Sequence, residues 1–265
     1  MLVSAISAFF ASVLYLYAST LILKKIQGRT TSDIRPTVMK IALVATIIHT
    51  FALSTTLWGD NSIHFNMGNG LSLVALLGGI ILLITCINKS TETLGIFIYP
   101  LAALTTLLPQ AFDTSTPLPY VLGSHVLISI AAYSIMGIAT AQAILYGVQE
   151  RRFRTKQLSN LMKALPPLQV MENTLVQLVM IGFIFLSFAL ISGIFFIEDI
   201  FAQHLIHKTF FAILSWVAYG VFLFGHFQYG WRGQKAARYT IWAYFLLILS
   251  FIGTEIILST LGYTQ

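Results

Sequence analysis

The sequence predicts an all-α, polytopic membrane protein with about eight transmembrane helices and with both termini outside. Apolar residues make up 57% of the 265 positions and charged residues only 9%, whereas soluble globular domains carry about 25% charged residues. The few charges cluster between apolar runs, each of roughly 20 residues, which is the length needed to cross ~30 Å of hydrocarbon. A third observation, the placement of the basic residues, predicts the orientation.

The predicted spans follow the apolar runs along the chain. By residue number they are 2–23, 38–57, 67–87, 95–109, 122–147, 175–196, 208–226 and 239–261. The fourth is short and contains Pro100, so a short tilted or re-entrant helix is an alternative to a full crossing. No soluble domain separates the spans, and we expect residues 1–265 to form a single transmembrane domain.

All but one of the 15 lysines and arginines fall in alternate loops. They are Lys24, Lys25, Arg29, Arg35 and Lys40; Lys89; Arg151, Arg152, Arg154, Lys156 and Lys163; and Arg232, Lys235 and Arg238, with Lys208 as the exception. Basic residues are retained on the cytoplasmic side of a membrane. This asymmetry predicts an even number of spans and both termini outside. It also explains the net charge of +6 without a nucleic-acid partner.

The longest cytoplasmic loop has a pattern of its own. Within residues 149–165, Leu158, Leu161, Met162 and Leu165 recur at helical spacing among basic residues, until Pro166 ends the pattern. An amphipathic helix on the inner leaflet and a solvated basic loop both fit this pattern.

Few residues could carry catalysis. Cys86 is the only cysteine, so the chain forms no disulfide of its own, and the motifs of hydrolases and nucleotide-binding enzymes are absent. We therefore assign no catalytic residue. Lipid is the partner that the composition implies directly.

The histidines are the most informative polar residues, and their expected depths separate them. His125 begins the fifth span and His207 the seventh; both spans enter from outside, so both rings lie near the outer face. His226 is 19 residues beyond His207, about 28 Å along a helix, and therefore cannot share a ligand site with it. His49 lies within the second span. His64 is expected in a solvated loop.

A haem iron takes two axial ligands at one depth, and neutral imidazoles suit it. His125 and His207 meet the depth condition, although two interfacial, hydrogen-bonded histidines would look the same in sequence. His49 is a ligand candidate, a pathway residue or a helix–helix hydrogen bond, because a polar group in hydrocarbon needs a partner. Glu255 lies inside the last span, where an acid is a functional candidate unless it is protonated or reaches the interface.

Several stretches of the second half resemble the cytochrome c assembly family, which includes CcsA, ResC and the HemX-like and YpjD-like proteins. The matching stretches are residues 125–133, 141–143 and 149–152; Ala-Leu-Pro-Pro-Leu-Gln at 164–169 with Met171 and Glu172; Ser192 and Gly193; His-Lys-Thr at 207–209 with Ser215 and Trp216; and Gly-Trp-Arg-Gly-Gln-Lys-Ala-Ala-Arg at 230–238. The similarity is greatest to the YpjD-like branch and implies a cytochrome c assembly-like core over about residues 65–260.

The resemblance implies haem as a cofactor and a bacterial inner (cytoplasmic) membrane location. His125 falls where haem-handling members carry an outer-face haem histidine, and His226 where they carry a histidine within a span. The tryptophan-rich outer motif of those members is absent, because Phe201–Thr209 occupies its place, and residues 257–265 contain no histidine. That His207 replaces the missing ligand is our inference.

The resulting prediction is an inner-membrane haem-binding or haem-handling protein, acting as an accessory protein rather than a complete haem ligase, with haem and other membrane proteins as partners. Two alternatives use the same residues. In a small transporter or permease, His49 and Glu255 would line a path without haem. In a regulatory or assembly subunit of a membrane complex, the polar residues would only fix helix packing.

Overall fold

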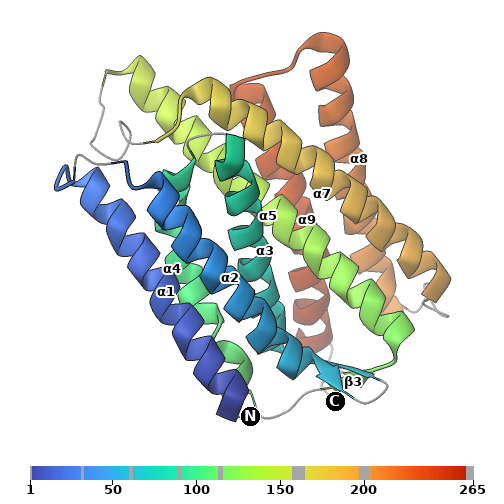
Figure 1. The fold of residues 1–265 in the computed structure, drawn as a ribbon. Helices are drawn as coiled ribbons and strands as arrows, with labels where there is room; N and C mark the ends of the chain where they lie inside the picture. The colour runs from blue at the N-terminus through green and yellow to red at the C-terminus, as the bar shows by residue number, and fades with distance from the viewer. Residues whose placement is uncertain are drawn as a thin grey trace. The chain divides into compact units, whose positions relative to one another are not determined.

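The computed structural model describes most of the chain. It covers residues 2–30, 33–59, 62–88, 91–112, 116–156, 165–196 and 203–260, with side chains except at 59, 88, 116, 196, 203–208 and 251–260. Figure 1 shows that the described chain is almost entirely helical. The contacts within the chain divide it into two compact units. The first unit is residues 1–124 with 152–170, and the second unit is residues 125–151 with 171–265.

Eight α-helices lie in the described residues, as the sequence predicts. They are α1 (Leu2–Ile26), α2 (Arg35–Leu57), α3 (Met67–Asn88), α4 (Gly95–Thr105), α5 (Tyr120–Arg154), α7 (Leu168–Phe196), α8 (Gln203–Tyr229) and α9 (Gln234–Thr260). Seven helical segments among the described residues are long and apolar enough to cross a membrane. Helix α5 continues past the expected end at 147, and α7 begins before 175. Residues 157–164, which make up most of the second half of the predicted amphipathic segment, lie outside the described residues.

The fourth span is longer than the sequence suggested. Two 3₁₀ segments, η1 (Glu92–Leu94) and η2 (Leu108–Ala111), extend α4 at its two ends. Together they give a 20-residue candidate span from Glu92 to Ala111. Pro100 lies inside α4 without ending it, so the proline is a poor guide to the length of this segment.

The first unit packs α1 to α4 against one another, as Figure 1 shows in blue and green. Helix α1 ends in a Schellman motif, in which Gly28 N–H donates to Lys25 C=O at 3.0 Å and Arg29 N–H to Lys24 C=O at 2.9 Å. Gly28 has a φ of +70°, a conformation that glycine adopts without steric cost. The turn leads into α2, where Pro36 occupies the first helical turn.

A small sheet replaces the solvated loop expected around His64. The strands β1 (Trp58–Gly59), β2 (Ser62–Phe65) and β3 (Thr116–Leu118) pair antiparallel in the order β1-β2-β3. His64 lies in β2 opposite Pro117, so the loop assignment of His64 was wrong. Strands of two to four residues are too short to show an alternating pattern in sequence.

Helices α5, α7, α8 and α9 make up most of the second unit. Side-chain hydrogen bonds to neighbouring helices fix their packing. Gln142 Nε2 donates to Met171 C=O at 3.2 Å, joining α5 to α7, and Trp216 Nε1 donates to Ser187 Oγ at 2.8 Å, joining α8 to α7. Ser215 Oγ donates to Ala243 C=O at 2.7 Å, joining α8 to α9. That the two units act as one transmembrane domain stays a prediction.

The orientation across the membrane stays a prediction that reporter fusions test. A reporter fused after Gly233, in the basic turn between α8 and α9, is expected to read cytoplasmic, and one fused after Leu118, in β3, to read outside. Alkaline phosphatase and green fluorescent protein report opposite sides, so each fusion carries its own control. The reverse pattern at both positions would contradict the orientation that the basic residues predict.

Candidate functional site

His125 lies in the second turn of α5 and faces α7. Its Nδ1 is 2.8 Å from Ser192 Oγ, and Ser192 in turn donates its hydroxyl proton to Ala189 C=O at 3.1 Å. When the Ser192 proton is used in this way, Ser192 Oγ can accept a hydrogen bond from a protonated Nδ1 of His125.

This arrangement suits an imidazole that ligates a metal. Ligating histidines usually donate their second ring N–H to a carboxylate, a carbonyl or water, which fixes the ring and the tautomer. The serine hydroxyl supplies that acceptor here. Ser192 is near the end of α7, so the pair also fixes the start of α5 against the end of α7. The residues at His125 therefore fit an axial haem ligand.

His207 lies in the second turn of α8, and its side chain is outside the described part of the structure. Its place along the backbone still bears on the predicted pair. Helix α7 ends at Phe196 and α8 begins at Gln203, so a short connection keeps the end of α7 and the start of α8 at the same end of the second unit. His125, paired with Ser192 on α7, lies at that end as well.

His226 occupies the other end of α8, in its last turn. Because α8 is continuous between His207 and His226, the two residues are separated by about 28 Å along the helix, as expected. Nδ1 of His226 donates to Trp231 C=O at 2.8 Å. Trp231 stacks on Tyr239 with ring centroids 4.9 Å apart, and Phe222 lies 6.1 Å from the imidazole. An aromatic cluster thus surrounds this histidine.

Gly225 lets the indole of Trp231 pack directly on α8, and its replacement is expected to disturb His226. A Cβ added at Gly225 would overlap Cε3 of Trp231. Gly225→Ala should therefore displace the indole, lengthen the hydrogen bond of His226 and cost about 1–3 kcal/mol in unfolding free energy. Near-ultraviolet circular dichroism measures the change. Gly220→Ala is the matched control, because its nearest neighbour would be 3.6 Å away, and an equal effect of both variants would contradict this packing.

His49 is completely buried in the first unit. Its Nε2 is 2.8 Å from Ser72 Oγ on α3, and its Nδ1 is 3.3 Å from Thr106 Oγ1, beyond the end of α4, and 3.5 Å from the hydroxyl of Tyr15 on α1. A haem iron at either ring nitrogen would have to displace one of these hydroxyls. The geometry therefore matches the helix–helix hydrogen bond that was one of the three roles open to His49.

The remaining candidates contribute less. Nε2 of His64 is 3.3 Å from Ser62 Oγ within β2. The side chain of Glu255, on α9, lies outside the described residues. Among the described residues, no group of three or more His, Cys, Asp or Glu side chains could hold a metal ion. A haem differs from such a site because the protein supplies only two axial ligands.

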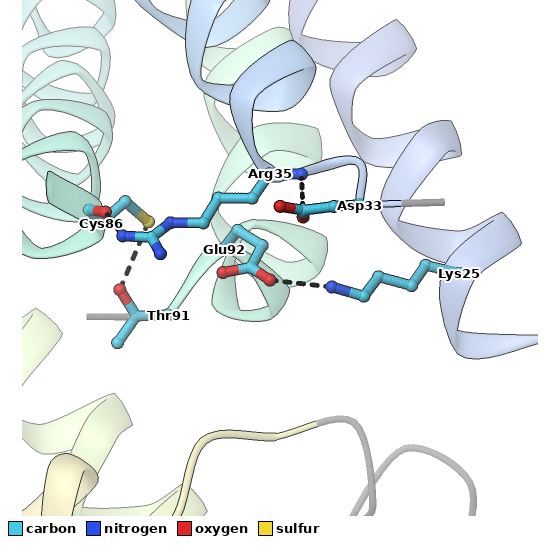
Figure 2. Close-up of polar contacts among 6 residues, drawn as sticks. All are labelled: Lys25, Asp33, Arg35, Cys86, Thr91 and Glu92. Carbon is cyan, nitrogen blue, oxygen red and sulfur yellow. Dashed lines mark hydrogen bonds and ion pairs between the residues drawn. The ribbon is translucent and has the colours of Figure 1, made fainter. Parts of the chain in front are cut away.

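Sequence reasoning missed a charged cluster in the first unit, which Figure 2 shows. Lys25 Nζ lies 2.9 Å from Glu92 Oε1, and the Glu92 side chain is only 5% exposed. Arg35 donates to the carbonyls of Cys86 and Ile87 at 2.6 and 3.2 Å, where α3 ends. Cations at a helix C-terminus are favourable. The cluster therefore holds the ends of α1, α2 and α3 against η1.

Comparison with known proteins places the chain in a family. The cytochrome C assembly protein family matches residues 2–261, which span both units. The inner membrane protein YpjD of Escherichia coli is 26% identical over 222 residues, covering 82% of this chain and 84% of YpjD. The cytochrome c biogenesis protein CcsA of Chlorella vulgaris is 26% identical over 243 residues, covering 76% and 77%.

A third relative, a 28.8 kDa protein of Azospirillum brasilense, is 27% identical over 175 residues. The match covers 62% of this chain and 63% of the length of the relative. No solved structure matches the chain. The candidate spans and the similarity to YpjD identify a multi-pass protein of the bacterial inner membrane. The family match covers nearly the whole chain, so this protein belongs to the cytochrome c assembly family.

Proposed function

We propose that the protein binds haem at the outer end of its second unit and acts as an accessory factor in cytochrome c assembly. The observation that carries the proposal is the hydrogen-bond chain from His125 Nδ1 through Ser192 Oγ to Ala189 C=O. This chain fixes the orientation of the imidazole, as a second hydrogen bond does for a histidine that ligates a metal. Membership of the family supports haem as the metal group, and CcsA is a relative named for cytochrome c biogenesis.

The roles of the residues follow from this geometry. His125 would hold the haem iron, and Ser192 would keep its imidazole oriented. His207 is the proposed second ligand, because it lies at the same end of the unit. A bound haem would supply an iron centre that can be presented to another protein of the assembly pathway.

The accessory role rests on what occupies the place of the tryptophan-rich motif. Residues 201–209 read Phe-Ala-Gln-His-Leu-Ile-His-Lys-Thr and contain no tryptophan. A surface that presents haem for attachment uses aromatic side chains to stack on the ring. We therefore infer that this chain binds haem without catalysing its attachment to an apocytochrome.

Deletion of the gene in its own bacterium tests the accessory role. We expect the covalent haem stain of c-type cytochromes to fall and to return when the wild-type gene is supplied. The chain co-expressed with an apocytochrome, in a host that lacks a maturation system, should yield no covalent haem. Covalent haem in that host would contradict the accessory role, and unchanged cytochromes in the deletion strain would contradict a role in assembly.

A further inference from the structure

A groove between α8 and α9 has a feature that haem binding does not use. It combines an arginine at one end with apolar walls along the helices. The residues that line it are Ala218 of α8 and Arg238, Tyr239, Trp242, Ala243 and Leu246 of α9. Helix α9 carries Arg238, Trp242 and Leu246 on one face, spaced by about one turn each. From Arg238 to Leu246 the groove extends about 12 Å by helical rise.

Small residues form the floor of the groove. Ala243 is held close to α8, because its carbonyl accepts a hydrogen bond from Ser215 Oγ at 2.7 Å. Tyr219, next to Ala218, donates to Thr240 C=O at 3.5 Å. The two helices therefore pack closely along this line, and the alanines leave a channel beside the exposed Trp242. Residues 209–229 of α8 form a candidate membrane span, and the sequence predicts a span over residues 239–261. A channel of this form between the two helices fits a hydrocarbon chain.

Arg238 distinguishes this channel from an ordinary lipid-facing surface. It is exposed, and among the described residues no acceptor for its guanidinium is found within hydrogen-bond or ion-pair distance. The other two basic side chains of this turn have neighbours, since Arg232 lies 3.8 Å from Glu172 and Lys235 lies 6.0 Å from the ring centre of Trp231. A guanidinium has five donors in a planar fork that matches phosphate oxygens.

We propose that the groove between α8 and α9 binds one anionic phospholipid, with its phosphate on Arg238 and an acyl chain along Ala218, Ala243 and Leu246. Charge complementarity selects the occupant. The turn between the helices and the start of α9 together carry three basic residues, and a phosphate at Arg238 would meet no acidic side chain among the described lining residues. Tyr239 and Trp242 supply the aromatic groups that favour the level of lipid headgroups.

The groove in the first unit provides a contrast. It is lined by Val3, Ile6, Ser7, Phe10, Ile47, Ile48 and Phe51 and has no charged lining residue. A hydrocarbon chain can enter it, but nothing there selects a headgroup. Of the grooves described, only the one between α8 and α9 therefore combines a channel for an acyl chain with an arginine that can bind a phosphate.

The experiment counts the lipids that purified protein retains. Wild-type protein is equilibrated in detergent micelles with equal amounts of phosphatidylglycerol and phosphatidylcholine that carry identical acyl chains, and native mass spectrometry counts each. One basic side chain near a membrane surface is worth about 1 kcal/mol towards an anionic lipid, or about fivefold in affinity. We expect one tightly held phosphatidylglycerol, favoured about fivefold over phosphatidylcholine. Equal retention of both lipids by wild-type protein would overturn the proposal.

Variants separate the two parts of the site. Arg238→Gln should abolish the fivefold preference, while Arg238→Lys should keep most of it. Arg152→Gln, which removes an equally exposed charge near the end of α5, should leave it intact. Ala218→Leu fills the channel but keeps the charge, so it should reduce retention of both lipids. If Arg152→Gln loses the preference for phosphatidylglycerol to the same extent as Arg238→Gln, the preference reflects non-specific attraction to basic residues. That result would overturn the proposed site.

A final arm tests the source of the phosphate. Glycerol phosphate carries the headgroup charge without acyl chains, and we expect it not to displace the retained lipid at equal concentration. Displacement would show that the groove contributes nothing to binding and would overturn the proposal. Each variant is compared at matched helical content by circular dichroism. If Arg238→Gln fails to fold, Ala218→Leu and the Arg238→Lys comparison still decide the outcome.

Discussion

His125→Ala is expected to abolish or shift the Soret band of haem-loaded protein. The substitution removes the imidazole that is proposed to hold the iron, and it leaves Ser192 without its hydrogen-bond partner on α5. The loss of one ligand changes the coordination of the iron, and the absorption spectrum reports this change directly. The measurement is a haem titration of detergent-purified protein, followed by the position and height of the Soret band.

Two further substitutions control for indirect effects. His64→Ala removes a histidine from β2 in the first unit and should leave the spectrum unchanged. Ser192→Ala keeps the ligand but removes its acceptor, and the loss of such an acceptor typically lowers metal affinity by about 10–100-fold. A wild-type spectrum in both His125→Ala and His207→Ala would place the site elsewhere, with His49 and His226 the next residues to test.

Lys25→Met is expected to destabilise the protein by about 3 kcal/mol. It leaves the nearly buried carboxylate of Glu92 without its ammonium partner at 2.9 Å, and its second oxygen, Oε2, has no hydrogen-bond partner among the described residues. The loss falls at the low end of the range for broken buried pairs because Lys25 is 36% exposed and water reaches the pair. Unfolding in mixed detergent micelles measures the change.

Matched variants test whether the buried carboxylate causes this loss. Glu92→Gln leaves an exposed ammonium that water can solvate, so the expected loss is only about 1 kcal/mol. When Glu92→Gln is combined with Lys25→Met, the double variant should recover most of the stability that Lys25→Met alone loses. Lys24→Met changes the neighbouring, exposed lysine and should cost less than about 0.5 kcal/mol. Equal losses for Lys24→Met and Lys25→Met would contradict the importance of the pair.

The membrane helices could be predicted because a single physical requirement dominates them. A run of apolar residues long enough to cross hydrocarbon is helical, since only a helix satisfies its own backbone there. The ends were less predictable. Helix α5 continues to Arg154 and α7 starts at Leu168, because outside the hydrocarbon a polar helix and a polar loop differ by little in hydropathy. The pairing of β2 with β3 joins segments about 50 residues apart, which no local pattern shows.

The candidate site was predicted only in part, for a related reason. Residue spacing gives the depth of His125, His207 and His226, but the direction of a side chain depends on how its helix is rotated against its neighbours. The partnership of His125 with Ser192 comes from such packing. The same holds for Lys25 and Glu92, which are 67 positions apart. In sequence Glu92 resembles any acid in a short polar loop, and only the fold shows that it is buried.

The most direct test of haem binding is the visible absorption spectrum of wild-type protein, purified in detergent after expression with added haem. We expect a Soret band with about one haem per chain, because the proposed pair of ligands serves a single ring. A colourless protein that is folded, as its helical content shows, would contradict haem binding. It would favour the reading of this fold as a transporter or as a packing subunit.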